Sequence, residues 1–227
     1  MLSVATCMSV SSSAQQPVKS RAAWATSRVS GAPEPPALYR IVPAFPQLKF
    51  QLPTCLEEIS GTNRLLVTER GGRIFSFANS ADVTQADLVT DLHAWLPSDL
   101  ADQPVSLFDA APHPKFVENH YLFVCYVHPG NGGHTRLSRL TLTTDTAPEA
   151  VPGSEQVILT WPSGGHNAGC LEFGPDGLLY IATGDGSGPN PPDALTTGQD
   201  VTDLLGAILR IDIDRAEGGK LYAVPAD

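Results

Sequence analysis

The chain has 227 residues, of which 17% are charged, and it contains 20 glycines and 20 prolines. This composition favours many turns and few helices, and therefore an all-β architecture. The formal net charge of −10 at pH 7 argues against a nucleic-acid partner and against binding to an anionic membrane surface. No stretch of the sequence reaches the ~20 apolar residues that a membrane-spanning helix needs.

The first 44 residues differ in composition from the rest. Residues 1–14 are mildly apolar and then serine-rich, which fits either a signal-peptide remnant or a plain disordered tail. Residues 15–44 are rich in Ala, Ser and Pro and cannot bury enough surface to fold alone, which indicates a leader or linker. Residues 45–227 are expected to form the folded part.

From Leu48 onward the sequence predicts a succession of short strands. In chain order the expected strands are 65–68, 74–77, 88–92, 121–127, 135–143, 156–161, 171–173, 178–183 and 208–213. They form three sets at a spacing of roughly fifty to sixty residues, the scale on which propeller blades recur. A β-sandwich is the architectural alternative.

The four cysteines are dispersed, and no C-x-x-C spacing occurs. This spacing does not predict a zinc site. Cys125 and Cys170 are each flanked by apolar residues, so both are expected to be buried free thiols. His128 and His134 flank a glycine-rich hairpin loop, and His113 precedes a proline at an expected blade corner, so no metal ligand is assigned.

The most informative segment is a hairpin at residues 164–186. Its turn is Gly-Pro-Asp-Gly at 174–177, between the strands 171–173 and 178–183. An antiparallel hairpin returns to the edge from which it started, so His166 and Asp185 are expected on one rim. The glycines beside them let the backbone approach another group closely. An imidazole and a carboxylate on one rim indicate a site, with a hydrogen-bonded structural histidine as the alternative.

A resemblance to the glucose/sorbosone dehydrogenase family rests on this hairpin, which reads G-G-H-N-A-G-C-L-E-F-G-P-D-G-L-L-Y-I-A-T-G-D-G, and on the segments 198–200 and 204–214 that follow. Residues 67–74 and 113–116 resemble earlier blades of the same family. The resemblance therefore covers residues 45–227. It implies a six-bladed β-propeller, of which this chain would hold three blades as the N-terminal fragment of a longer protein.

The same resemblance implies an oxidoreductase that depends on pyrroloquinoline quinone (PQQ) and acts on the CH–OH group of sugars or related alcohols. It implies His166 as the general base, Asn190 and Gln103 as substrate contacts, and Asn167 and Asp185 as cofactor contacts. Calcium is implied as a second cofactor. The calcium ligands and the basic residues that hold PQQ are expected after Asp227. A periplasmic or extracellular location is expected, and no electron acceptor is indicated.

Two positions depart from the family pattern. Gly165 stands where the glucose enzyme has an aspartate that contacts substrate. Pro104 replaces a sugar-binding glutamine, unless Gln103 takes that place by a shift of one residue. Retention of His166 favours the enzyme, whereas the departures leave a non-catalytic binding module of the same family as the alternative. The loop 186–193 lacks a regular carboxylate spacing, which favours a rigid rim loop over a calcium site.

Overall fold

The computed structural model describes residues 39–143 and 146–226. The chain divides into two compact units, 1–42 and 43–227. Of the first unit, residues 39–42 are described, and they hold no helix or strand. The expected segment 1–14 and most of the expected leader 15–44 lie outside the described residues. The second unit carries all the described helices and strands.

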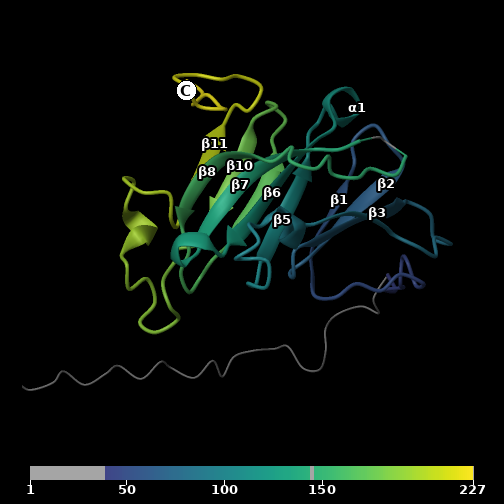
Figure 1. Ribbon diagram of the computed structural model, residues 1–227, viewed down its shortest axis with the longest axis horizontal. Coiled ribbons are helices and arrows are strands. Elements are labelled where there is room, and N and C mark those ends of the chain that lie inside the picture. The colour runs from purple at the N-terminus through teal and green to yellow at the C-terminus, as the bar shows by residue number, and fades with distance from the viewer. Residues whose placement is uncertain (1–38, 144–145, 227) are drawn as a thin grey trace, which may run out of the picture. The chain divides into compact units, whose positions relative to one another are not determined.

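The second unit contains three antiparallel sheets, which we call blades 1, 2 and 3 (Figure 1). Blade 1 pairs β1 (Pro53–Glu58), β2 (Arg64–Glu69), β3 (Arg73–Ala78) and β4 (Asp87–Asp91) in chain order. Blade 2 pairs β5 (Ser106–Pro112), β6 (Tyr121–His128), β7 (His134–Thr141) and β8 (Gln156–Pro162) in the same way. Blade 3 contains β9 (Gly169–Phe173), β10 (Leu179–Thr183) and β11 (Ile208–Ile211). The helical pieces are η1 (Leu92–Trp95), α1 (Phe116–Asn119), η2 (Gly130–Gly132) and η3 (Thr197–Gln199).

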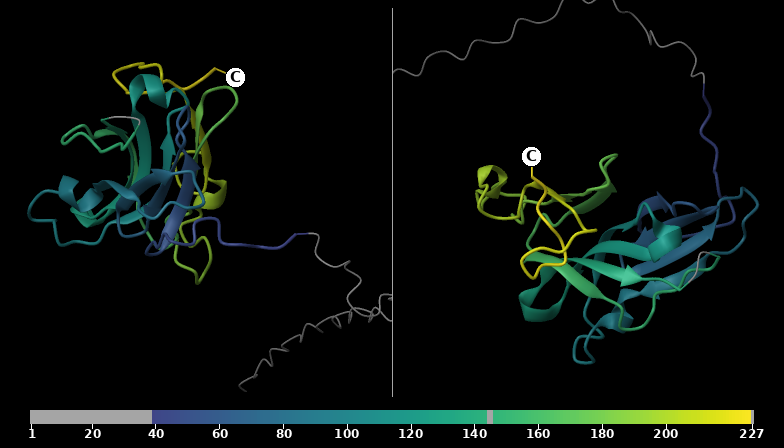
Figure 2. Two further views of the ribbon diagram at one scale, coloured as in Figure 1. Left: turned by 90° about the vertical axis from the view of Figure 1, so that its right-hand side faces the viewer. Right: turned by 90° about the horizontal axis from the view of Figure 1, so that it is seen from above.

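Blade 2 lies between the other two blades (Figure 2). The first strand of each blade is its inner strand, and β5 packs against both β1 and β9. Each blade is an antiparallel meander. The loops from an outer strand to the next inner strand, and those from a second to a third strand, therefore leave one face of the blades. The remaining turns leave the opposite face.

Strand β6 shows how the blades are held together. Its alternate residues Leu122, Val124 and Tyr126 belong to the apolar cluster shared with blade 1, whereas Phe123 and Cys125 belong to the cluster shared with blade 3. Successive side chains of a strand point to opposite faces, so a strand covered on both faces is a nearly continuous apolar run. Burial of each large apolar side chain contributes about 1.5–3 kcal/mol. The strand predicted at 121–127 therefore contributes to both apolar clusters of the described residues.

Two features differ from the sequence-based expectations. The inner strands β1 and β5 were not among the expected strands, because they carry Pro, Ala and acidic residues in place of a regular alternation. Cys170 is exposed, so the prediction that it is buried is wrong, whereas Cys125 is buried as predicted. Apolar neighbours in a strand lie on the opposite face, so the buried Leu171 beside Cys170 indicates exposure of the thiol.

His113 forms the blade corner that its sequence position predicted. The residue is 2% exposed at the end of β5. Its Nδ1 accepts hydrogen bonds from the Lys115 amide, at 3.0 Å, and from Asn119 Nδ2, at 2.8 Å. Its Nε2 therefore carries the ring hydrogen and donates to Asp214 Oδ1, at 3.1 Å. The imidazole joins the end of blade 2 to the segment that follows β11.

This corner predicts a pH-dependent stability. Burial lowers the pKa of His113 below its ordinary value, so the folded chain favours the neutral ring. When the pH falls below ~6.5, the unfolded chain takes up this proton first, and the free energy of unfolding decreases. We expect the loss between pH 7.5 and pH 5.5, measured by urea unfolding, to be smaller in His113→Gln than in the unsubstituted chain. An equal loss in both proteins would assign the pH dependence to other groups.

Candidate functional site

Three loops on one face of the blades carry the five residues predicted for the site. His166 and Asn167 lie in the β8–β9 loop, Asp185 and Asn190 in the β10–β11 loop, and Gln103 in the β4–β5 loop. The β6–β7 loop contacts both the β4–β5 loop and the β8–β9 loop, because Gly130 lies against Leu100 and Gly133 lies against Ser163. The order of strands therefore brings these loops to a common face.

The β8–β9 and β10–β11 loops pair backbone to backbone. The Gly165 amide donates to Gly186 O at 2.9 Å, and the His166 amide donates to Ser187 O at 2.7 Å. The Gly186 amide donates to His166 O at 3.3 Å. A Cβ atom on Gly184 would lie 2.0 Å from His166 O. Glycine is required there because the two backbones approach more closely than any side chain allows.

His166 and Asp185 form a hydrogen-bonded pair within this loop pairing. The Nδ1 of His166 lies 3.1 Å from Asp185 Oδ1, which also accepts from the Ser187 amide at 2.9 Å. A carboxylate only accepts, so Nδ1 carries the hydrogen and Nε2 is the acceptor of the ring. The His166 side chain is 46% exposed. The predicted common rim is thus present, with an accessible imidazole whose orientation a carboxylate fixes.

Asn167 closes the β8–β9 loop, since its Oδ1 accepts from the Gly164 amide at 2.6 Å. We call His166, Asn167 and Asp185 the rim site. Asn190 and Gln103 are exposed on the same face. The described hydrogen bonds of residues 39–143 and 146–226 do not connect either amide with the rim site. The structure therefore brings together three of the five predicted residues.

The β10–β11 loop is held by polar residues that the sequence reasoning did not assign. Asp193 Oδ1 accepts from the Thr197 amide at 2.8 Å, and Thr197 Oγ1 donates to Asp185 O at 2.8 Å. The Leu195 amide donates to Ser187 Oγ at 3.1 Å. Ser187 and Thr197 are buried. Hydroxyl residues in a Gly- and Pro-rich loop were the available sequence signal, and their hydrogen bonds hold this loop together beside Asp185.

The departure at Gly165 has a steric consequence. A Cβ atom at this position would lie 2.4 Å from Ser187 O and 2.8 Å from Gly188 Cα. Both contacts are with backbone atoms, so a side chain at this position, such as the aspartate expected there from the glucose enzyme, cannot be accommodated unless the β10–β11 loop moves. Glycine at position 165 therefore allows the β8–β9 and β10–β11 loops to pair this closely.

The two histidines that flank the β6–β7 loop have structural partners. His128 Nδ1 accepts from the Gly130 amide at 3.0 Å. His134 Nδ1 lies 3.1 Å from Gly130 O, and its Nε2 accepts from Arg136 Nε at 3.0 Å. Both nitrogens of His134 are thereby used. This arrangement supports the hairpin role predicted for the pair.

None of the helices in residues 39–143 and 146–226 has both the length and the hydropathy of a membrane span.

Comparison with known proteins identifies the family and the fold. The family model described as glucose/sorbosone dehydrogenase matches residues 50–219. Among solved structures, PQQ-bound aldose sugar dehydrogenase from Streptomyces coelicolor superposes with a TM-score of 0.55 at 22% identity, over 75% of this chain and 48% of that one. The apo-form of soluble aldose sugar dehydrogenase from Escherichia coli gives 0.52 at 20% identity, over 75% and 49%. The predicted all-β propeller of this type, with three blades in this chain, is confirmed.

Curated relatives match similar portions. Hedgehog-interacting protein from Homo sapiens is 26% identical over 175 residues, which are 73% of this chain and 25% of that protein. An uncharacterized protein from Synechocystis is 30% identical over 181 residues, 72% of this chain and 39% of that protein. The chain thus spans between a quarter and about half of the length of these relatives and structures. The chain belongs to the glucose/sorbosone dehydrogenase family.

Proposed function

We propose that the protein is an oxidoreductase acting on the CH–OH group of sugars or related alcohols, with His166 as the general base. The hydrogen bond between His166 Nδ1 and Asp185 carries this proposal. Removal of a hydride from a CH–OH carbon requires that the hydroxyl proton be accepted by a group within hydrogen-bond reach. An accessible Nε2 acceptor on an imidazole fixed by Asp185 supplies such a group.

PQQ and calcium are the cofactors that we propose for the whole protein. The family assignment and a PQQ-bound neighbour support PQQ. The described rim by itself does not fit this tricarboxylate, because the chain has no Lys or Arg between Arg139 and Arg210, and acidic residues occupy the β10–β11 loop. We therefore assign to this chain only the acceptance of the hydroxyl proton, and no step at the quinone. Cationic residues elsewhere in the longer protein would hold the cofactor.

The other residues have supporting roles in this proposal. Asp185 orients His166, and Asn167 fixes the loop that carries it. The exposed amides of Asn190 and Gln103 offer both donors and acceptors to sugar hydroxyls from the same face. A periplasmic or extracellular location is proposed from the family alone.

The test is turnover by the full-length protein reconstituted with PQQ and calcium, measured as reduction of an artificial electron acceptor in the presence of aldoses. We expect His166→Ala to lower the rate by ~10²-fold or more, the usual scale of general-base catalysis. Asp185→Asn should lower the rate less, since the imidazole remains. Asp176→Asn, the same chemical change at the exposed turn of this hairpin, should keep the rate. Unchanged turnover in His166→Ala would remove His166 from the mechanism.

The alternative is a non-catalytic binding module. The similarity to Hedgehog-interacting protein and the absence of space for a side chain at Gly165 favour it. A full-length protein that neither binds PQQ in a spectroscopic titration nor reduces an acceptor would support this alternative.

A further inference from the structure

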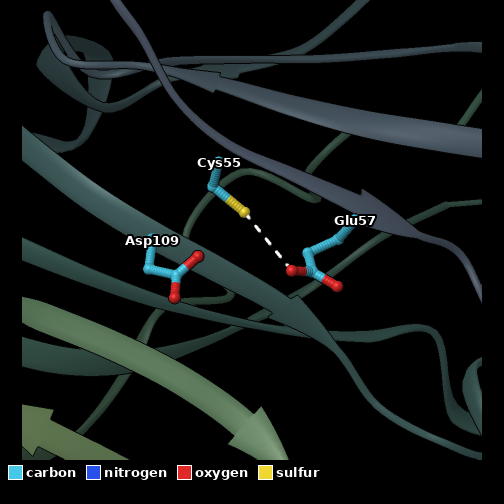
Figure 3. Close-up of side chains that lie close together, drawn as sticks. All are labelled: Cys55, Glu57 and Asp109. Carbon is cyan, nitrogen blue, oxygen red and sulfur yellow. Dashed lines mark hydrogen bonds between the residues drawn. The ribbon is translucent and has the colours of Figure 1, made fainter. Parts of the chain in front are cut away.

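A cluster of metal-ligand side chains lies between the inner strands of blades 1 and 2, outside the rim site. Cys55 and Glu57 are two residues apart on β1, so their side chains share one face of the strand. Asp109 lies on β5, where the register with β6 shifts. One ligand atom from each of these three residues lies within 4.8 Å of those from the other two. Figure 3 shows the sulfur and the two carboxyl groups directed toward a common space.

The neighbouring backbone holds these groups in position. Asp109 is 7% exposed, and its two oxygens accept from the Ala110 amide at 2.9 Å and the Leu171 amide at 2.7 Å. Cys55 Sγ lies 3.8 Å from Glu57 Oε1 and 3.7 Å from Ala110 O. Each carboxylate oxygen has two acceptor sites, so the amide bonds of Asp109 leave capacity for a further ligand.

The cluster combines two carboxyl groups with a thiol. Within the described ranges 39–143 and 146–226, neither Glu57 nor Asp109 forms an ion pair with Lys, Arg or His. Two carboxyl groups beside a thiol are ligands that a divalent cation would bind together.

The donor set and the space around it restrict the cation. Calcium and magnesium are bound by oxygen ligands, whereas zinc accepts thiolate, carboxylate and water together. With bonds of ~2.3 Å to sulfur and ~2.0 Å to oxygen, tetrahedral zinc separates its ligands by about 3.5 Å. The distance of 3.8 Å between Cys55 Sγ and Glu57 Oε1 is near this value, and a ligand atom of Asp109 lies within 4.8 Å of those of the other two residues. Of the three residues, Glu57 also lines a cavity of about 340 Å³, together with Leu171 and Glu172.

We propose that Cys55, Glu57 and Asp109 bind one divalent cation of the zinc class, with water in the remaining position. The spacing of the cysteines did not predict such a site, because two of its three ligands are carboxylates and one of these lies on another blade. The cation would join the inner strands of blades 1 and 2. This proposal does not depend on the proposed oxidoreductase function.

The experiment titrates the reduced, untagged 227-residue chain with Zn²⁺ by calorimetry and with Co²⁺ by absorption spectroscopy. We expect one ion per chain, release of the thiol proton on binding, and a thiolate-to-cobalt charge-transfer band. Cys55→Ser should abolish the band, and Glu57→Gln should weaken Zn²⁺ binding at least ~10-fold. Glu58→Gln removes an exposed carboxylate from the same strand and should change neither result.

Three results would overturn the proposal. They are the absence of stoichiometric binding, binding without a thiolate band, and binding that both Cys55→Ser and Glu57→Gln leave unchanged. Circular dichroism checks the fold of each variant. If Cys55→Ser does not fold, the partly exposed and nearly isosteric Glu57→Gln decides the question.

Discussion

Gly184→Ala is expected to destabilise the chain by about 2–3 kcal/mol, although it adds a single methyl group. The new Cβ would lie 2.0 Å from His166 O and 2.9 Å from the Ala168 amide nitrogen. Both are backbone atoms, so no side-chain rotation relieves the overlap, and the β8–β9 loop must move away from β10. The hydrogen bonds that hold His166 beside Asp185 and Ser187 would then be lost or lengthened.

Gly188→Ala is the matched control for this experiment. Gly188 lies in the same loop, a Cβ there would meet nothing within 4 Å, and its φ is not positive. We therefore expect a change within ~0.5 kcal/mol. Urea unfolding measures the free energies, and the NMR signals of the His166 ring report its environment. Equal stabilities of the two variants would contradict the close pairing of the loops.

The rim site could be predicted because one hairpin carries most of it. A turn of known chemistry fixes where the hairpin reverses, and the antiparallel pairing then returns Asp185 to the level of His166. The long apolar strand β6 was predictable for a related reason, since both of its faces are buried. Local pattern determines such features without knowledge of the other blades.

The inner strands β1 and β5 could not be predicted in the same way. β1 and β5 pair with a neighbouring strand on one side only and carry Cys55, Glu57 and Asp109 where a core strand has apolar residues. Their strand structure follows from pairing with β2 and β6, which is a tertiary effect. The polar cluster follows from the packing of β5 against β1, which sequence spacing does not encode.

The contact between blades 2 and 3 leaves no space for a side chain at Gly169, which lies against Cys125. A Cβ at Gly169, the first residue of β9, would lie 2.1 Å from the sulfur of Cys125, which is fully buried in β6. The φ of Gly169 is not positive, so the backbone itself would tolerate alanine. The requirement for glycine here is therefore the volume of the thiol on the neighbouring blade.

A double-mutant cycle tests this relation. Gly169→Ala should destabilise the chain by about 2–3 kcal/mol through overpacking, and Cys125→Ala by about 1 kcal/mol through a small cavity. In the double variant the alanine methyl at 169 occupies space that the sulfur has left, so we expect the total loss to be smaller than the sum by about 1–2 kcal/mol.

Gly71→Ala, where a Cβ meets nothing within 4 Å, serves as the control and should be additive with Cys125→Ala. Additive losses in the Gly169 and Cys125 variants, measured by urea unfolding, would contradict the contact between blades 2 and 3 at this pair, because substitutions of residues in contact are expected to couple.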